Sequence, residues 1–429
     1  MRQIMGVVAL STVFCWCLVG QAQKNWKDRA EYDLYESITK EQNANTKLGL
    51  LNSWKEKYPS SEYKDVRAQL IMDTYRQLGR GKEMMDAAKD LLTIDPKNLS
   101  GLYWMNLLTI SLKDTSPAAL DQGDKVAKDL LASLDDTFAA SKKPAQVTDE
   151  AWKKSRSDAE KTAYRTLGWT AMQRNQYAES EQNFLKALAI DPGDGEVSSW
   201  LGTVTLRQKT PEKQSAALYH FARAAVYDGQ GALPEAARKQ YLSYLEKTYS
   251  NFHGSRDGLD QILTSAKTNP VPPEGFRIKS SYEIAAEKEE EFKKTNPRLA
   301  FWMSIKKELA GPNGQQYFDN GVKDAMLPPE NLENVPTLKG KVISMKPATR
   351  PKEVVLGISD AENAEVTLKF ETPLPGKADP GTEIEFKGRA ESFTPDPFNL
   401  TFDVDPGDLV GWPVKPPPAP ARKAPPKKK

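Results

Sequence analysis

Cysteine is almost missing from this chain of 429 residues. Its two cysteines, Cys15 and Cys17, both lie near the amino terminus. If that segment is removed, the mature chain has no thiol, which excludes disulfides, thiolate nucleophiles and cysteine metal sites together. Histidine is equally scarce, because only His220 and His253 are present and they are not at metal-ligand spacing. We therefore expect no metal and no cofactor.

The motifs of common catalytic sites are also missing. The sequence contains no glycine-rich phosphate loop and no dinucleotide-binding fingerprint. Three aspartates, Asp403, Asp405 and Asp408, lie close together but do not follow the spacing of a calcium-binding EF-hand loop, which favours a polar turn. We predict a non-catalytic protein, and the alternative is a hydrolase whose unrecognised site uses His253 or several carboxylates.

The chain has no strong excess of charge of either sign. It carries 60 Lys or Arg and 58 Asp or Glu, and hydrophobic residues make up 39% of it. This composition is typical of a folded, soluble protein. A formal net charge of +2 gives no reason to expect nucleic acid as a partner.

One long apolar run is present, at the amino terminus. Arg2 provides a positive start, Ile4 to Gly20 are apolar or small, and Gly20-Gln21-Ala22 offers a cleavage site. This pattern predicts a secretory signal peptide at 1–22 and a protein exported to the periplasm or beyond the cell. The run is shorter than the ~20 residues of a spanning helix, so we expect no integral membrane segment after cleavage.

A repeated helical pattern follows, and it is clearest in the middle of the chain. Tyr164, Leu167 and Gly168 lie at helical spacing, and a second helix carries Tyr177, Ser180, Phe184 and Ala187 before Pro192 ends it. Small residues at 168 and 180 allow two antiparallel helices to approach closely. The pattern returns in the residues Leu201, Gly202, Ala217, Phe221 and Ala224.

These residues resemble the tetratricopeptide repeat (TPR) consensus, with Ala171 in place of one aromatic. The resemblance, to a secreted bacterial TPR protein, implies a right-handed solenoid of helix pairs over 23–270. It also implies that the concave face, formed by the first helix of each pair, binds a protein or peptide. As contact residues exposed on first helices we predict Arg165, Thr170, Gln173 and Ser199. The helix that carries Tyr164 should be long and begin after Thr148, which we expect to be its N-terminal cap.

The pattern changes after residue 270. A helical connector is expected at 271–330, and a small β-domain at 331–412. Alternating apolar residues predict five short strands, which contain Val342, Val354 to Ile358, Val366 to Phe370, Ile384 to Phe386, and Leu400 to Val404. Five antiparallel strands of this length resemble an oligonucleotide/oligosaccharide-binding (OB) fold, a small barrel. The predicted fold class is therefore mainly α, a TPR-type solenoid followed by a five-stranded antiparallel β-barrel-like domain.

Charge limits what such a β-domain could bind. Residues 331–412 contain nine Lys or Arg and fourteen Asp or Glu, a net charge of −5. A groove that follows a phosphate backbone needs the opposite sign, so we do not expect nucleic acid here. The alternative function is binding of a cell-envelope glycan or another small polymer through the β-domain.

The carboxyl-terminal segment 413–429 is rich in proline and lysine. Its six cations are accompanied by no acid. We predict a disordered, extended tail, and we consider an electrostatic contact with anionic envelope polymers as its possible role.

Overall fold

The structure is a computed structural model that describes residues 24–332 and 334–413. The chain divides into two compact units, one ending at Ser281 and the other beginning at Tyr282. The predicted signal peptide at 1–22 and the predicted tail, apart from Pro413, lie outside the described residues.

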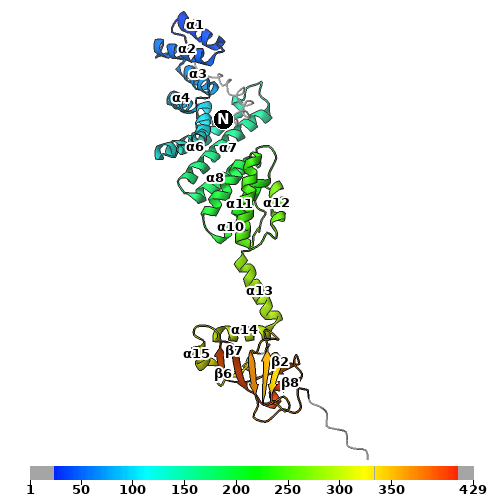
Figure 1. The fold of residues 1–429 in the computed structure, drawn as a ribbon. Helices are drawn as coiled ribbons and strands as arrows, with labels where there is room; N and C mark the ends of the chain where they lie inside the picture. Colours follow the sequence, from blue (N-terminus) through cyan, green and yellow to red (C-terminus); the bar gives the residue numbers. More distant parts are fainter. Residues whose placement is uncertain (1–23, 333, 414–429) are drawn as a thin grey trace, which may run out of the picture. The chain divides into compact units, whose positions relative to one another are not determined.

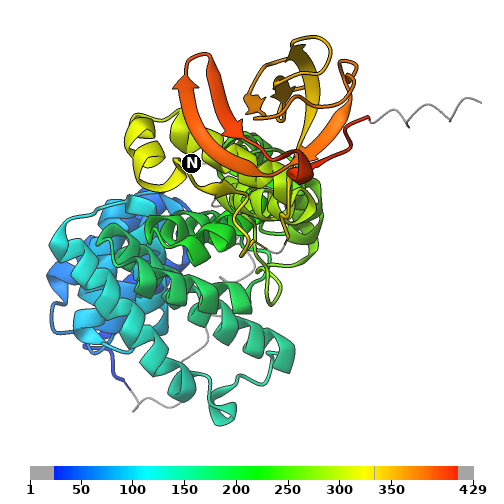
Figure 2. The ribbon, with the colours of Figure 1, turned by 90° about the horizontal axis from the view of Figure 1, so that it is seen from below.

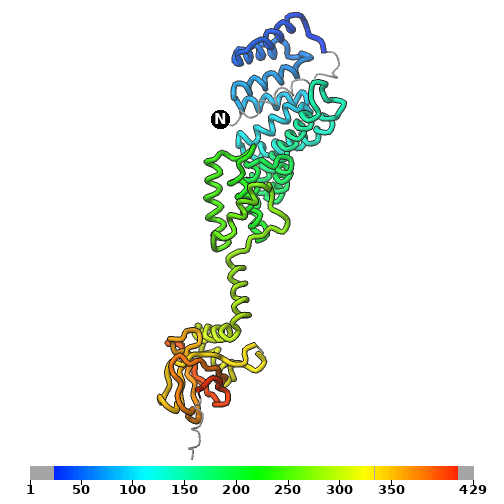
Figure 3. Tube along the Cα trace, turned by 90° about the vertical axis from the view of Figure 1, so that its right-hand side faces the viewer, coloured from blue at the N-terminus to red at the C-terminus, as the bar shows by residue number. Residues whose placement is uncertain are grey.

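The first unit consists of helices that pair in sequence order (Figures 1 and 3). From α1 to α11 each helix packs against the next one along the chain, as expected for an array of helical hairpins, whereas α12 packs against α10. The helices are α1 (Arg29–Lys40), α2 (Ala44–Lys57), α3 (Lys64–Gln77), α4 (Gly81–Ile94), α5 (Leu99–Leu112), α6 (Pro117–Thr137), α7 (Asp149–Gln173), α8 (Tyr177–Ile190), α9 (Gly195–Arg207), α10 (Pro211–Val226), α11 (Glu235–His253) and α12 (Leu259–Thr268), with a 3-10 turn, η3 (Ala140–Lys142).

Side-chain caps explain where several of these helices begin. The Thr148 hydroxyl accepts a hydrogen bond from the Ala151 backbone N–H at 3.1 Å, which confirms the predicted cap of α7. Asp194 caps α9 in the same way, through the N–H of Val197 at 3.0 Å. Such caps satisfy backbone donors that the first turn of a helix leaves unpaired.

The first unit ends with an extended segment that returns to the last helices. Ile278 is 5% exposed and packs into the same cluster as Tyr219 of α10. Its backbone N–H donates to the Ser215 hydroxyl at 3.0 Å. Because of these contacts the first unit continues to Ser281, beyond the boundary after residue 270 that the sequence suggested.

The second unit combines helices with one sheet. The helical elements are α13 (Ser281–Thr295), α14 (Pro297–Leu309), α15 (Gly314–Tyr317), a short π-helix η4 (Phe318–Val322) and a short 3-10 helix η5 (Pro406–Asp408). The strands are β1 (Met326–Leu327), β2 (Leu338–Lys346), β3 (Glu353–Gly357), β4 (Val366–Lys369), β5 (Glu383–Phe386), β6 (Gly388–Pro395), β7 (Phe398–Asp403) and β8 (Leu409–Val410), in the order β1-β6-β7-β4-β3-β2-β5-β8.

This sheet corrects the predicted five-stranded antiparallel barrel. Strands β2, β3, β4, β5 and β7 correspond to the five predicted strands, but the described residues form an eight-stranded sheet that curls strongly (Figure 2). The β4 and β7 strands are parallel, whereas every other neighbouring pair is antiparallel. Strand β6 was not predicted because, among its eight residues, only Ala390 has a buried apolar side chain, so the sequence shows no alternation there.

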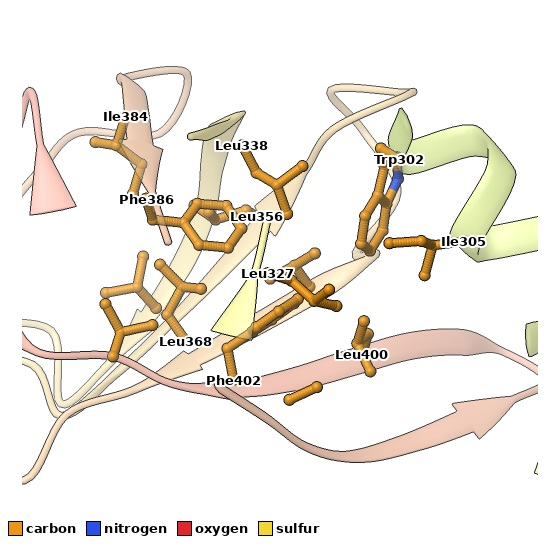
Figure 4. Packing of buried hydrophobic residues seen from close by; sticks show 14 of the residues in the cluster. Trp302, Ile305, Leu327, Leu338, Leu356, Leu368, Ile384, Phe386, Leu400 and Phe402 are labelled. Atoms are coloured by element: carbon orange, nitrogen blue, oxygen red, sulfur yellow. The ribbon is translucent and has the colours of Figure 1, made fainter. Parts of the chain in front are cut away.

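Helix α14 belongs to the core of this sheet. Trp302, Ile305 and Leu309 are at most 5% exposed and pack with Leu338, Phe402 and other strand residues (Figure 4). The Trp302 indole N–H also donates to the buried carboxylate of Glu365, at 3.3 Å. One continuous hydrophobic core therefore holds the helix and the strands together.

Candidate functional site: the surface of the helical repeats

Helices α7 and α8 touch where the sequence places its small residues. A methyl group added to Gly168 would lie 2.4 Å from a ring carbon of Phe184, so only glycine fits this approach. The Ser180 hydroxyl donates to the Gly168 carbonyl at 2.7 Å, while Phe184 and Ala187 are fully buried. These side chains hold the two helices together rather than facing a partner.

The next pair, α9 and α10, repeats this arrangement. A methyl group added to Gly202 would lie 2.6 Å from the Phe221 ring. Leu201, Ala217 and Ala224 are at most 1% exposed. Equivalent residues thus make equivalent contacts in two successive pairs, as a repeat architecture requires.

The remaining residues of the repeat pattern are only partly buried or are exposed. Tyr164, Leu167 and Tyr177 are half-buried and pack against neighbouring core clusters. The Tyr177 hydroxyl donates to the Asn175 side chain at 2.6 Å. Pro192 is exposed, two residues after the end of α8.

Two of the four predicted contact residues are not exposed, which corrects the sequence interpretation. Thr170 is 0% exposed and Ser199 is 2% exposed. Their hydroxyls donate to carbonyls of their own helices, Thr170 to Thr166 at 3.0 Å and Ser199 to Glu196 at 2.7 Å. These internal bonds satisfy the hydroxyls, so both small polar side chains can sit between helices. Gln173 is half-buried near the end of α7.

Arg165 is occupied by the neighbouring repeat. Its guanidinium pairs with Asp194 at 2.7 Å and with Glu196 at 2.6 Å, and it lies 5.4 Å from the centre of the Trp200 ring. The side chain is only 23% exposed. Arg165 therefore ties α7 to the start of α9, and its guanidinium is already neutralised by two carboxylates.

A groove between the first helices α9 and α11 offers a more open surface. It encloses about 620 Å³, and we call it the α9–α11 groove. Its lining residues are Thr203, Leu206, Arg207, Lys209, Phe221, Gln240, Tyr241 and Tyr244. None of them was singled out from the sequence as a contact residue, because three different helices bring them together.

Aromatic rings line this groove. The Phe221 ring is stacked with Tyr241 at 6.1 Å between centroids and meets Tyr244 edge-on at 5.1 Å. Tyr244 is 44% exposed, one of the most exposed large apolar side chains of the first unit. An exposed aromatic surface with polar tips is well suited to contact with another chain.

Two cations accompany the rings. Arg207 and Lys209 are exposed at the end of α9, and no described carboxylate lies within ion-pair distance of either. Most other cations on this part of the array, such as Arg165 and Lys213, are paired. The α9–α11 groove therefore combines apolar contact area with unpaired positive charge.

Neither histidine lies in the α9–α11 groove: one is buried and the other contacts a backbone carbonyl. His220 is 2% exposed, and burial lowers its pKa to about 4. His253 lies at the end of α11, where Nδ1 is 2.8 Å from the Lys279 carbonyl oxygen. The described residues contain no cluster of His, Cys, Asp or Glu that could hold a metal ion. In the same part of the chain, no helix is long and apolar enough to cross a membrane.

Part of this chain is similar to solved structures, including the following three. A thermophilic TPR protein of Thermus thermophilus is 18% identical and matches 51% of this chain and 96% of its own, with a TM-score of 0.28. A TPR protein of Parabacteroides merdae is 13% identical, with shares of 56% and 99% and a TM-score of 0.29. The assembly chaperone of RpL4 is 12% identical, with shares of 62% and 99% and a TM-score of 0.39.

A comparison with curated protein sequences finds no match. A family model, described as tetratricopeptide repeat, matches residues 162–194. This segment covers the second half of α7, the whole of α8 and the turn before α9, and it includes the contact between Gly168 and Phe184. The chain thus contains a tetratricopeptide repeat at residues 162–194.

Proposed function

We propose that the helical repeats form a protein-interaction scaffold, which holds an extended segment of a partner protein in the α9–α11 groove. The observation that carries this proposal is the groove itself, where the exposed Tyr244 and the half-buried Tyr241 adjoin two cations without carboxylate partners. We further propose that the helix pairs wind in a right-handed sense, with the first helices on the concave side.

The chemistry of the groove suggests what its partner carries. Tyr241 and Tyr244, which lie against the buried Phe221 ring, can pack against an apolar or proline side chain of a bound segment. Arg207 and Lys209 can pair with a carboxylate beside it, and they lose no existing ion pair in doing so. We therefore expect a partner segment in which acidic and apolar residues alternate.

Site-specific cross-linking tests this proposal. A photoreactive phenylalanine analogue placed at Tyr244 of the full chain should capture one partner reproducibly in intact cells. The same group at Tyr282, which is 81% exposed but lies outside the groove, serves as the control. Equal capture of the same proteins from both positions would contradict a binding groove.

Charge reversal sharpens the test. Arg207→Glu together with Lys209→Glu should strongly reduce capture at Tyr244, because the groove would repel an acidic segment. Lys128→Glu is the matched control, since Lys128 is an exposed lysine on α6 away from the groove residues. An undiminished yield in the double variant would show that these cations do not contribute.

We also propose that the protein is exported and cleaved near residue 22, as the apolar amino-terminal run suggests. Fractionation of cells, followed by amino-terminal sequencing of the chain, tests this. A chain that keeps Met1 and stays with the cytosol would contradict export.

For the second unit, we propose an OB-fold relationship. Support comes from the pairing, in which β2 contacts both β3 and β5, β4 runs parallel to β7, and a single residue, Lys387, separates β5 from β6. A glycan-binding role is not favoured, because Trp302, Phe386 and Phe402 are buried in the core instead of forming an exposed platform.

A further inference from the structure

The residues that precede α1 lie against the first helices in the manner of a bound peptide. Residues 24–27, which we call the strap, belong to no helix. Lys24 and Trp26 are half-buried, whereas Asn25 and Lys27 are exposed. This alternation is that of an extended segment, in which residues two positions apart face the same side. The strap therefore presents one cation and one aromatic ring to the helices.

An aromatic pocket holds the Trp26 ring. Trp26 is stacked on Tyr63, with 3.8 Å between the ring centroids. The centroids of Tyr35 and Trp54 lie 5.0 Å and 6.0 Å from that of Trp26. The three pocket rings come from α1, from α2 and from the residue just before α3. Contacts among aromatic rings at these distances are favourable beyond the area that they bury, so the pocket is well suited to an indole.

A carboxylate beside this pocket binds the cation of the strap. Lys24 Nζ lies 2.7 Å from an oxygen of Asp65, and the two side chains are only 21% and 20% exposed. The same ammonium group lies 5.8 Å from the centre of the Tyr63 ring. Salt screens a partly buried ion pair less than an exposed one. The surface therefore favours a positive charge two positions before the tryptophan.

Hydrogen bonds bind the backbone of the strap as well. The N–H of Asn25 donates to the Glu62 carboxylate at 2.7 Å. The N–H of Lys27 donates to the Glu31 carboxylate at the same distance. The carbonyl of the first strap residue accepts a hydrogen bond from the Tyr63 hydroxyl, also at 2.7 Å. Main-chain hydrogen bonds give affinity for an extended segment, while pockets for alternate side chains give specificity.

The pocket has supports of its own besides the strap. The Trp54 indole N–H donates to Glu31 at 2.9 Å, and the Tyr63 N–H donates to the Ser61 hydroxyl at 3.0 Å. Helix α1 is capped by Asp28, which follows the strap and accepts a hydrogen bond from the Glu31 N–H at 2.8 Å. We therefore expect the helices, rings and carboxylates to stay in place when the strap detaches.

We propose that the strap is an internal ligand that closes a peptide-binding site on α1, α2 and α3. A partner segment that carries Lys or Arg two positions before an aromatic residue can replace it, because the aromatic pocket and the Asp65 carboxylate fit that chemistry. A site that is open for only part of the time binds its ligand more weakly in proportion. The site shares no residue with the α9–α11 groove, so the two proposals can fail separately.

Titration of the full chain with a peptide tests this proposal. The probe is a synthetic peptide of residues 24–28, Lys-Asn-Trp-Lys-Asp, with blocked ends and a fluorophore, and its binding is followed by fluorescence anisotropy. Lys24→Ala together with Trp26→Ala should open the site and raise the affinity for the probe by about tenfold or more over the unchanged chain. Lys27→Ala is the matched control, because Lys27 contributes its backbone N–H and should keep the site closed.

A second probe, in which alanine replaces the tryptophan, should not bind the opened chain. The proposal is overturned if the opened chain binds the first probe no better than the unchanged chain does, or binds both probes equally. The strap would then be ordinary packing. Circular dichroism and thermal melting check the fold of each variant. If the double variant loses helix, Lys24→Ala alone, which keeps the Trp26 ring, should still raise the affinity, and an unchanged affinity would contradict the proposal.

Discussion

The two units of this chain are stabilised in different ways. The repeats bury their apolar side chains in several separate clusters, each shared by neighbouring helices. The second unit has one continuous core in which α14 and nearly all the strands take part. In the repeats, contacts are local and similar units follow one another, so a change should be felt mainly by its neighbours. In the second unit, a change at one residue should affect the whole.

The largest expected effect concerns α14. We expect a fragment of residues 331–413 not to fold, because it lacks Trp302, Ile305 and Leu309 of the core, whereas residues 282–413 should unfold cooperatively. Thermal unfolding followed by circular dichroism compares the two. Equal cooperative transitions in both fragments would show that α14 is not needed for this core.

The second largest effect is expected for the buried carboxylate of Glu365, in the same unit. Although burial raises the pKa of Glu365, hydrogen bonds from Lys306, Ser359 and the Ile358 backbone lower it. We expect Glu365→Gln to destabilise the second unit by about 3 kcal/mol, since hydrogen bonds to a charged acceptor are lost. Calorimetry should show this change, and the exposed Glu362→Gln should leave the transition in place.

If Glu365→Gln also lowered the transition of the repeats, the two units would not be independent. If it left the second unit unchanged, the network around Glu365 would have no net stabilising effect.

A smaller and more local effect is expected in the repeats. Gly168→Ala places a methyl group 2.4 Å from the Phe184 ring and should cost about 1 to 3 kcal/mol. Gly49→Ala is the control, because nothing lies within 4 Å of the added carbon. That change should be neutral or stabilising by less than about 1 kcal/mol, as expected for an open helical position. Equal effects at both sites would contradict the close contact of α7 with α8.

The smallest expected effect depends on pH. His220 has a folded pKa of about 4, below its usual 6.5, because burial disfavours the imidazolium form. Between pH 6.5 and pH 4 the unfolded chain therefore takes up a proton that the folded chain refuses, and stability falls with falling pH. We expect a loss of roughly 1 to 2 kcal/mol between about pH 7 and pH 5.

His220→Gln should remove that pH dependence, whereas His253→Gln should keep it, because the buried ring of His220 remains in that variant. Chemical denaturation at several pH values measures both. A slope that persists in His220→Gln would assign the proton uptake to another group.

Residue patterns made part of this structure predictable. The contact between Gly168 of α7 and Phe184 of α8 could be predicted, because small and aromatic residues recur at helical spacing in both helices. Five strands were visible because their apolar residues alternate. Strand β6 was not, since its side chains are mostly polar, and it is held by backbone pairing with β7.

The candidate site was harder to predict than the fold. Thr170 and Ser199 were expected to be exposed because of their positions on first helices, but both are buried, and carbonyls of their own helices accept hydrogen bonds from their hydroxyls. The α9–α11 groove depends on residues of α9, α10 and α11, and periodicity within one helix does not reveal which side chains meet across three. Its only sequence signal was the pair of tyrosines at 241 and 244, which lie one helical turn apart.

Binding by separated units tests the central claim most directly. Residues 24–281 and residues 282–413 are each used to capture, from an envelope extract, the partner identified by cross-linking at Tyr244. We predict that residues 24–281 retain this partner as well as the full chain does, and that Arg207→Glu with Lys209→Glu abolishes the retention. Retention by residues 282–413 alone would contradict the account, because the repeats would then only support a binding site located in the second unit.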